Sequence, residues 1–84
     1  MKEAAMTTLT AAVHELDVKG LQCPMPIVKT AKAMRELASG DLIQIVATDP
    51  GSVKDFAAWS RATGNELVES SAIGGVFRFV MRKR

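Results

Sequence analysis

The sequence predicts an α/β (α+β) two-layer sandwich of βαβαββ order, in which a four-stranded mixed sheet has two helices on one face. Two observations support this prediction: apolar residues recur with the period of a strand in four segments, and with the period of a helix in two segments between them. A chain of 84 residues has room for one domain. Helices that alternate with strands in this order pack together on the sheet.

The N-terminal part of the chain is predicted to contain an arm and the first strand. Residues 1–10 mix small and polar types without a period, so we expect a flexible arm there and a single domain over residues 11–84. Apolar and polar residues then alternate over residues 12–18, which predicts a strand with His14 on its more apolar side.

The first helix is predicted between two turn signals. Pro24 and Pro26 fit its first turn, because N–H groups at that position have no partner within the helix. Gly40 is expected to end the helix. The helical spacing predicts an apolar face made of Ile27, Ala31, Met34 and Ala38.

A second strand and a second helix follow. Residues 42–48 form a short segment rich in β-branched types, which favours a strand. Asp49 and Pro50 are typical of the N-cap and the first position of a helix, and Gly64 is typical of its end. The inward face of this helix is predicted to contain Val53, Phe56 and Ala57.

The last two strands are predicted as a hairpin over residues 66–70 and 76–82. Gly74 and Gly75 lie between them and indicate a slightly loose turn. Alternation in the second of these strands places one set of side chains on a single face, namely Phe77, Phe79 and Met81.

Composition excludes several classes of site. With 11 Lys plus Arg and 9 Asp plus Glu, the net charge of +2 neither requires nor excludes an anionic partner. Cys23 and His14 are the single cysteine and histidine, which rules out an internal disulfide and a structural zinc site. The sequence has no Walker loop, dinucleotide-binding glycine pattern or acidic metal cluster, so we expect no cofactor and no metal. It also has no signal-peptide pattern or membrane-spanning run, and we expect a cytoplasmic location.

Cys23 is the main candidate for chemistry. If the first helix is a right-handed crossover between parallel strands, the loop over residues 20–23 lies beside the turn over residues 49–52, at the sheet edge where α/β proteins bind ligands. Cys23 would then stand at the mouth of the helix. There the helix dipole, together with Lys19 and Lys29, is expected to lower the pKa of its thiol.

Each candidate also has a structural interpretation. A lone cysteine is often a small buried apolar side chain, and His14 is more simply explained as a structural histidine than as a base for Cys23. Asp49 is explained as a helix cap, and Asp17 as a turn former at the end of a strand. Trp59 fits the edge of the core better than a half-exposed contact for a partner.

Basic residues form a cluster at the C-terminus and a second group on the outer side of the first helix. Their members are Arg78, Arg82, Lys83 and Arg84 in the cluster, and Lys29, Lys32 and Arg35 on the helix. Solvated charges explain both groups more simply than an RNA surface, because the chain has no tyrosine and no evident aromatic stacking platform.

The spacing of several residues matches a known pattern, whose most specific element is Cys-Pro-x-Pro between the first strand and the first helix. The matching residues are Leu16, Asp17, Gly20, Cys23, Pro24, Pro26, Gly40, Asp41, Thr48, Asp49, Pro50 and Asp55. With them the chain resembles the TusA-like (SirA-like) sulfur carriers from about Glu15 to Arg82. The resemblance implies a βαβαββ sandwich in which Cys23 receives sulfane sulfur as a persulfide and passes it on by protein contact. It implies supporting roles for Asp17, Gly20, Pro24, Pro26, Asp49 and Pro50.

The resemblance further implies a carrier rather than an enzyme, with no cofactor and at most weak sulfurtransferase activity, and we expect the carrier to be a monomer. Its expected partners are a sulfur donor, such as a cysteine desulfurase or a rhodanese, and a sulfur acceptor, such as a DsrE-like protein. Membrane binding and direct nucleic-acid binding are not expected. A single cysteine also fits a relay, because it cannot resolve its own persulfide and must pass the sulfur to an external acceptor.

Members of this family serve sulfur oxidation, tRNA thiolation or molybdenum-cofactor assembly. Met25 and Gln22 stand where the tRNA-thiolation carriers have an acidic and a basic residue, which favours a broader role in sulfur relay. Two alternatives stay open. A small RNA-binding module is one, since the predicted fold resembles the C-terminal domain of a bacterial translation initiation factor. A thiol redox sensor is the other.

Overall fold

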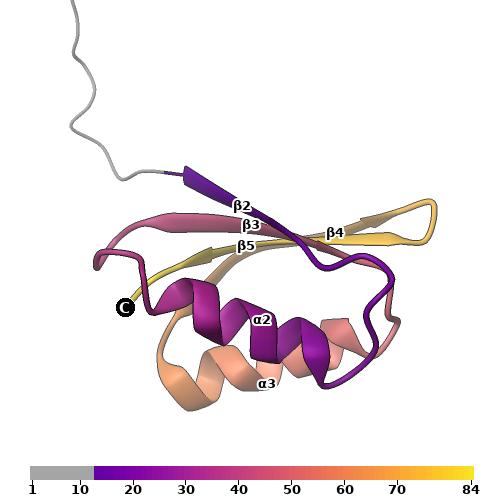
Figure 1. The fold of residues 1–84 in the computed structure, drawn as a ribbon, viewed down its shortest axis with the longest axis horizontal. Helices are drawn as coiled ribbons and strands as arrows, with labels where there is room; N and C mark the ends of the chain where they lie inside the picture. The colour runs from indigo at the N-terminus through magenta and orange to yellow at the C-terminus, as the bar shows by residue number, and fades with distance from the viewer. Residues whose placement is uncertain (1–12) are drawn as a thin grey trace, which may run out of the picture.

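The computed structural model of the protein describes residues 13–84 (Figure 1). The strands and helices are β2 (Val13–Asp17), α2 (Met25–Met34), β3 (Leu42–Ala47), α3 (Ser52–Thr63), β4 (Glu66–Ile73) and β5 (Val76–Arg82). This order confirms the predicted βαβαββ sandwich. The arm expected over residues 1–10 lies outside the described residues and stays a prediction.

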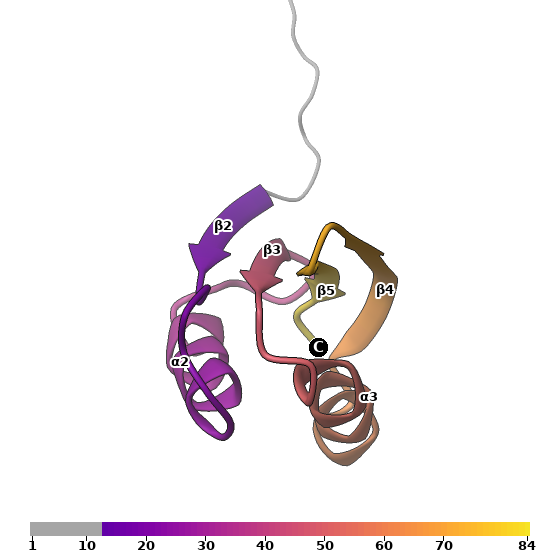
Figure 2. The same cartoon turned by 90° about the vertical axis from the view of Figure 1, so that its right-hand side faces the viewer.

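The four strands form one mixed sheet in the order β2-β3-β5-β4. β2 pairs with β3 in parallel, whereas β5 pairs antiparallel with both β3 and β4. A parallel pair needs a crossover connection, and α2 supplies it. Figure 2 shows both helices on the same face of the sheet, as predicted.

The core lies between the helices and the sheet. The predicted alternation of β5 is confirmed, since Phe79 and Met81 are fully buried and Phe77 is partly buried against the core. The ring of Phe79 stacks on that of Phe56 in α3 with the centroids 4.5 Å apart, which packs this helix against the sheet. The other buried core residues are Val18, Met34, Ile43, Ile45 and Ala47. Within residues 13–84, neither helix is long and apolar enough to span a membrane.

α2 is shorter than predicted. It begins at Met25, with Pro24 as N-cap, and it ends at Met34 rather than near Gly40. Backbone bonds from each amide to the carbonyl three residues earlier tighten the chain after Met34, and the Lys83 ammonium donates to the Met34 carbonyl at 2.7 Å. These contacts satisfy the end of the helix without a glycine. The helix buries Pro26, Thr30 and Met34, so the predicted face is wrong at Ala38, which lies beyond the helix end.

α3 begins two residues later than predicted. Gly51 takes the N-cap position that the sequence assigns to Asp49. The backbone carbonyl of Asp49 instead accepts hydrogen bonds from the Ser52 amide (3.0 Å) and the Ser52 hydroxyl (2.6 Å). The helix buries Ser52 and Phe56, which lie about one turn apart. Val53 lies about 100° from Ser52 around the helix axis. It is therefore 40% exposed, and its predicted inward position is wrong.

The hairpin is longer and tighter than predicted. Gly64 ends α3 in the left-handed region, as expected, and β4 then continues to Ile73, beyond the predicted end at residue 70. Ile73 pairs with Val76, so only Gly74 and Gly75 form the turn. Their φ angles of 59° and 81° lie in the region that favours glycine, as tight hairpin turns require.

Candidate functional site

The loops that follow β2 and β3 meet at one edge of the sheet, as predicted. The Gly20 amide donates to the Thr48 hydroxyl at 2.9 Å, and the Cys23 amide donates to Oδ2 of Asp49 at 3.1 Å. The Asp49 carboxylate therefore holds the backbone of Cys23 instead of capping α3. The sequence does not reveal this role, because the two residues lie 26 positions apart in the chain.

Other motif residues shape the same edge. Asp17 accepts a hydrogen bond from the Lys19 amide at 2.9 Å, the contact expected of a turn former. Gly20 follows with a φ of 84°, a conformation that favours glycine. Pro26 is buried on α2, and Pro50 lies in the turn that leads to α3.

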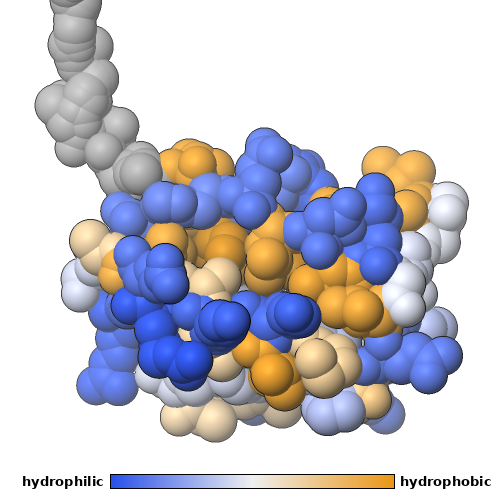
Figure 3. All heavy atoms as spheres, viewed as in Figure 1, coloured by the Kyte–Doolittle hydropathy of each residue, from blue (hydrophilic) through white to orange (hydrophobic). Residues whose placement is uncertain are grey.

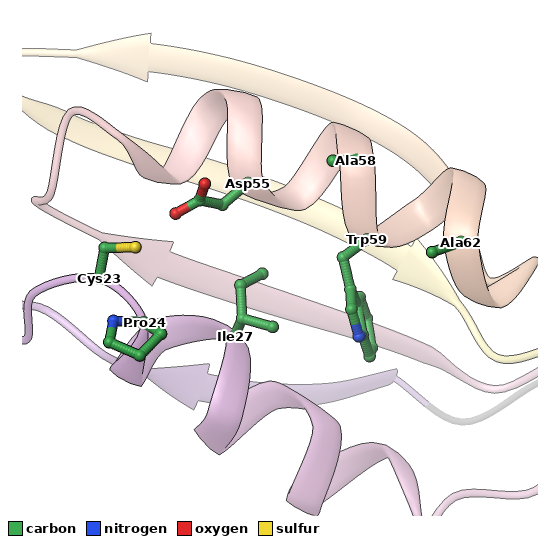
Figure 4. A pocket seen from close by; sticks show the side chains of 7 residues that line it. All are labelled: Cys23, Pro24, Ile27, Asp55, Ala58, Trp59 and Ala62. Atoms are coloured by element: carbon green, nitrogen blue, oxygen red, sulfur yellow. The ribbon is translucent and has the colours of Figure 1, made fainter.

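Cys23 is exposed at a groove between α2 and α3. The groove has a volume of about 370 Å³ and is mostly apolar (Figure 4); its lining residues are Cys23, Pro24, Ile27, Asp55, Ala58, Trp59 and Ala62. The interpretation of Cys23 as a buried core side chain is thus wrong. Trp59 packs partly buried against the core and also lines this groove. A protein partner can reach the sulfur and bury the apolar walls beside it.

Asp55 faces Cys23 from the first turn of α3. Figure 4 shows its carboxylate and the Cys23 sulfur pointing toward each other. The sulfur and a carboxylate oxygen from each of Asp49 and Asp55 all lie within 4.8 Å of one another. The predicted sheet edge places Asp55 near Cys23, and the family resemblance includes it. Nothing local distinguishes it from any other acidic residue in a first helical turn, so its contact with the sulfur is visible only in the structure.

The carboxylates reverse the predicted effect on the Cys23 thiol. The pKa of this thiol is raised, first because the Asp55 carboxylate accepts a hydrogen bond from the thiol, then through desolvation and the negative charges of Asp55 and Asp49. Neither Lys19 nor Lys29 offsets these charges. The expected lowering of the pKa is therefore wrong, and the free carrier's cysteine is held mainly as the neutral thiol at neutral pH.

The same three side chains are grouped closely enough for one cation to touch all of them. The sequence predicts that the loop of Cys23 lies beside the turn of Asp49, but it does not predict that both carboxylates approach the sulfur, because the three residues come from two separate loops and a helix. Exposed acidic residues often lie near one another without an ion, and we assign none here. The contacts of the two carboxylates with Cys23 explain why the three side chains lie close together.

His14 is not brought to Cys23. Its Nε2 atom lies 3.3 Å from Oδ2 of Asp41. This pair connects the beginning of β2 to the beginning of β3, whereas Cys23 follows the opposite ends of these strands. The structural interpretation of His14 therefore holds, and it is not a base for the cysteine.

Comparisons with known proteins identify the family of the chain. A profile of the family described as "Sulfurtransferase TusA" matches residues 14–83. The chain belongs to the TusA family of sulfur carrier proteins. The sulfur carrier protein TusA of Allochromatium vinosum is 51% identical over 70 residues, which cover 83% of this chain and 92% of that protein. The sulfur carrier protein TusA of Pseudomonas entomophila is 33% identical over 78 residues, which cover 90% and 98%.

A solved structure supports the fold of this carrier. The SirA-like protein of Desulfitobacterium hafniense superposes with a TM-score of 0.72 at 21% identity, and the match covers 83% of this chain and 95% of that one. At this level of identity the likeness concerns the fold alone.

The basic side chains at the C-terminus of this TusA-family carrier are used within the domain. They make four contacts: Arg78 with Gln44, Arg82 with Glu66, Lys83 with the Met34 carbonyl, and Arg84 with the Thr63 carbonyl. A cation that already binds an internal acceptor is less available to a phosphate. The basic residues of α2 and its C-cap are different, since Lys29, Lys32 and Arg35 are exposed, and Figure 3 shows hydrophilic side chains over this helix.

Proposed function

We propose that this carrier receives sulfane sulfur as a persulfide on Cys23 and relays it to a partner protein. The observation that supports the proposal is the position of Cys23, the single cysteine of the chain, exposed beside an apolar groove. A partner that covers the groove brings its own sulfur next to Cys23. The backbone bond to Asp49 keeps the loop in place for that contact.

The transfer is a thiol–persulfide exchange without net oxidation. In loading, the Cys23 sulfur attacks the outer sulfur of a donor persulfide, a new S–S bond forms, and the donor's own S–S bond breaks. The proton of Cys23 ends on the departing donor thiolate. In release, an acceptor thiolate attacks the outer sulfur of the Cys23 persulfide, and Cys23 leaves and regains a proton.

We propose a cysteine desulfurase or a rhodanese as donor and a DsrE-like protein as acceptor, with a monomeric carrier acting in the cytoplasm. Met25 is exposed beside Cys23, and Gln22 is exposed before it, so neither supplies the charges expected for tRNA thiolation. We therefore propose a broader sulfur relay. The raised pKa of the Cys23 thiol disfavours the redox-sensor alternative, because sensor cysteines need thiolate character.

Intact-protein mass spectrometry after incubation with thiosulfate and rhodanese, or with cysteine and a cysteine desulfurase, tests the proposal. The parent is expected to gain about 32 Da, one sulfur atom, and to lose it on reduction. Cys23→Ser should keep its fold by circular dichroism and gain nothing. A reducible mass gain in Cys23→Ser would show that the sulfur is bound elsewhere.

A further inference from the structure

We propose that Asp55 is a positioning residue for sulfur transfer: its carboxylate accepts the hydrogen of the Cys23 thiol, keeps the sulfur directed into the α2–α3 groove and restrains its reaction in the free carrier. This inference deepens the proposed function and rests on it. The effect of Asp55 on the reactivity of Cys23 can be measured without any sulfur transfer.

The backbone fixes where the Asp55 carboxylate lies. The Asp55 amide donates to the Gly51 carbonyl at 3.1 Å, which places the residue in the first turn of α3, and the next residue, Phe56, is fully buried. A Cβ atom at Gly51 would meet Oδ2 of Asp49 at 3.4 Å and Oδ2 of Asp55 at 3.9 Å. Both carboxylates therefore converge on the same small region beside Cys23.

The two carboxylates have different contacts there. Asp49 accepts the backbone amide of Cys23, so its main action is on the loop. Asp55 acts on the side chain, since its carboxylate points toward the sulfur in Figure 4 and accepts the thiol hydrogen. Asp49 thus holds the backbone of Cys23, and Asp55 holds its sulfur.

The rest of the groove adds no positive charge. From α2 and its cap the groove receives Pro24 and Ile27, and from α3 it receives Ala58 and Trp59 beside Asp55. Among residues 13–84, the charged groups that face the sulfur are thus the Asp55 carboxylate on α3 and the Asp49 carboxylate on the turn before it. Both oppose a thiolate, in agreement with the raised pKa of Cys23.

This arrangement has a chemical consequence for each step. Before loading, the proton of Cys23 lies between its sulfur and Asp55, and it leaves for the departing donor thiolate as the new S–S bond forms. After release, the regenerated Cys23 thiol donates to Asp55 again. Small electrophiles and oxidants, which depend on the thiolate fraction, meet a less reactive cysteine than an isolated thiol would be.

The test measures the rate of iodoacetamide alkylation of the free carrier against pH. Asp55→Asn keeps the size of the side chain and removes its charge, Asp55→Glu keeps the charge, and Glu69→Gln removes an exposed charge on β4, away from the groove. We expect Asp55→Asn to move the pH profile to lower pH and to raise the rate at pH 7 by roughly threefold or more, because the thiolate fraction rises. Asp55→Glu should lie nearer the parent, and Glu69→Gln should overlay it.

An Asp55→Asn profile that overlays the parent, or one that moves to higher pH, would overturn the proposal. So would an equal shift in Glu69→Gln, which would show a general charge effect. Circular dichroism at each pH checks that all variants are folded. Loading from glutathione persulfide, followed by the mass gain, extends the test to sulfur: Asp55→Asn should load faster than the parent. If the parent itself gains no sulfur, the proposed function fails, while the alkylation profiles still decide the role of Asp55.

Discussion

Replacing Asp49 by alanine should make the Cys23 sulfur more reactive and its loop less well held. The change removes the acceptor of the Cys23 amide bond of 3.1 Å but keeps the backbone carbonyl that binds Ser52. A hydrogen bond to a charged group contributes about 1.5–3 kcal/mol, and the exposure of the loop reduces the expected loss to about 1 kcal/mol. For a domain of this size, a loss of about 1 kcal/mol lowers Tm by about 4–8 °C.

The same substitution lowers the stability of the loop but should increase the reactivity of the Cys23 thiol. Asp49 is one of the negative charges that raise the pKa of Cys23, so its removal should lower that pKa and speed alkylation at pH 7. The charge of Asp49 is the weakest of the causes, and the effect should therefore be smaller than that of Asp55→Asn. Sulfur transfer to a protein partner should nevertheless slow, because the loop no longer presents the sulfur in one position.

Thermal unfolding, alkylation against pH and transfer to a protein acceptor measure the three effects. Asp17→Ala is the matched control, since Asp17 also accepts a backbone amide near this edge, at 2.9 Å from Lys19, and does not contribute to the shift at Cys23. It should lower Tm slightly and leave alkylation unchanged. Slower alkylation in Asp49→Ala would refute the effect of the Asp49 charge on the Cys23 thiol. An unchanged Tm, or sulfur transfer that rises together with alkylation, would refute the assignment of the Cys23 backbone to Asp49.

Two further predictions concern stability. Because the folded pKa of the Cys23 thiol is raised, the contribution of this group is fully present below the unfolded pKa near 8.5 and is lost as pH rises through the folded pKa. Urea unfolding from pH 7 to 10 should show a steeper loss for the parent than for Cys23→Ser, and parallel curves would contradict this. Lys83→Met keeps the alkyl stem but removes the bond to the Met34 carbonyl, so the free energy of unfolding should fall by about 1–2 kcal/mol. Lys29→Met, an exposed change on the same helix, should cost less than about 0.5 kcal/mol, and equal losses would show that Lys83 has no special role.

The order of the elements and the position of the cysteine follow from local signals. The alternation of β5 predicts its buried face, the prolines beside Cys23 predict where the first helix begins, and Gly64 predicts where the second one ends. Such signals depend on residues that are close in the sequence, so they can be recognised without knowing which distant residues pack against them. They fail where distant contacts decide, as at the end of α2, which the C-terminal Lys83 caps.

The chemistry around Cys23 depends on contacts that no local pattern contains. By itself, the sequence determined that a single cysteine stands at a helix mouth, and from that position alone a lowered pKa of its thiol follows. The structure decided that this cysteine is exposed. The tertiary structure raises the pKa of the Cys23 thiol instead, because the parallel pairing of β2 and β3 brings Asp49 and Asp55 close to the sulfur. The dipole of a helix is a fraction of a charge, whereas two nearby carboxylates are full charges, and one of them also accepts the thiol hydrogen.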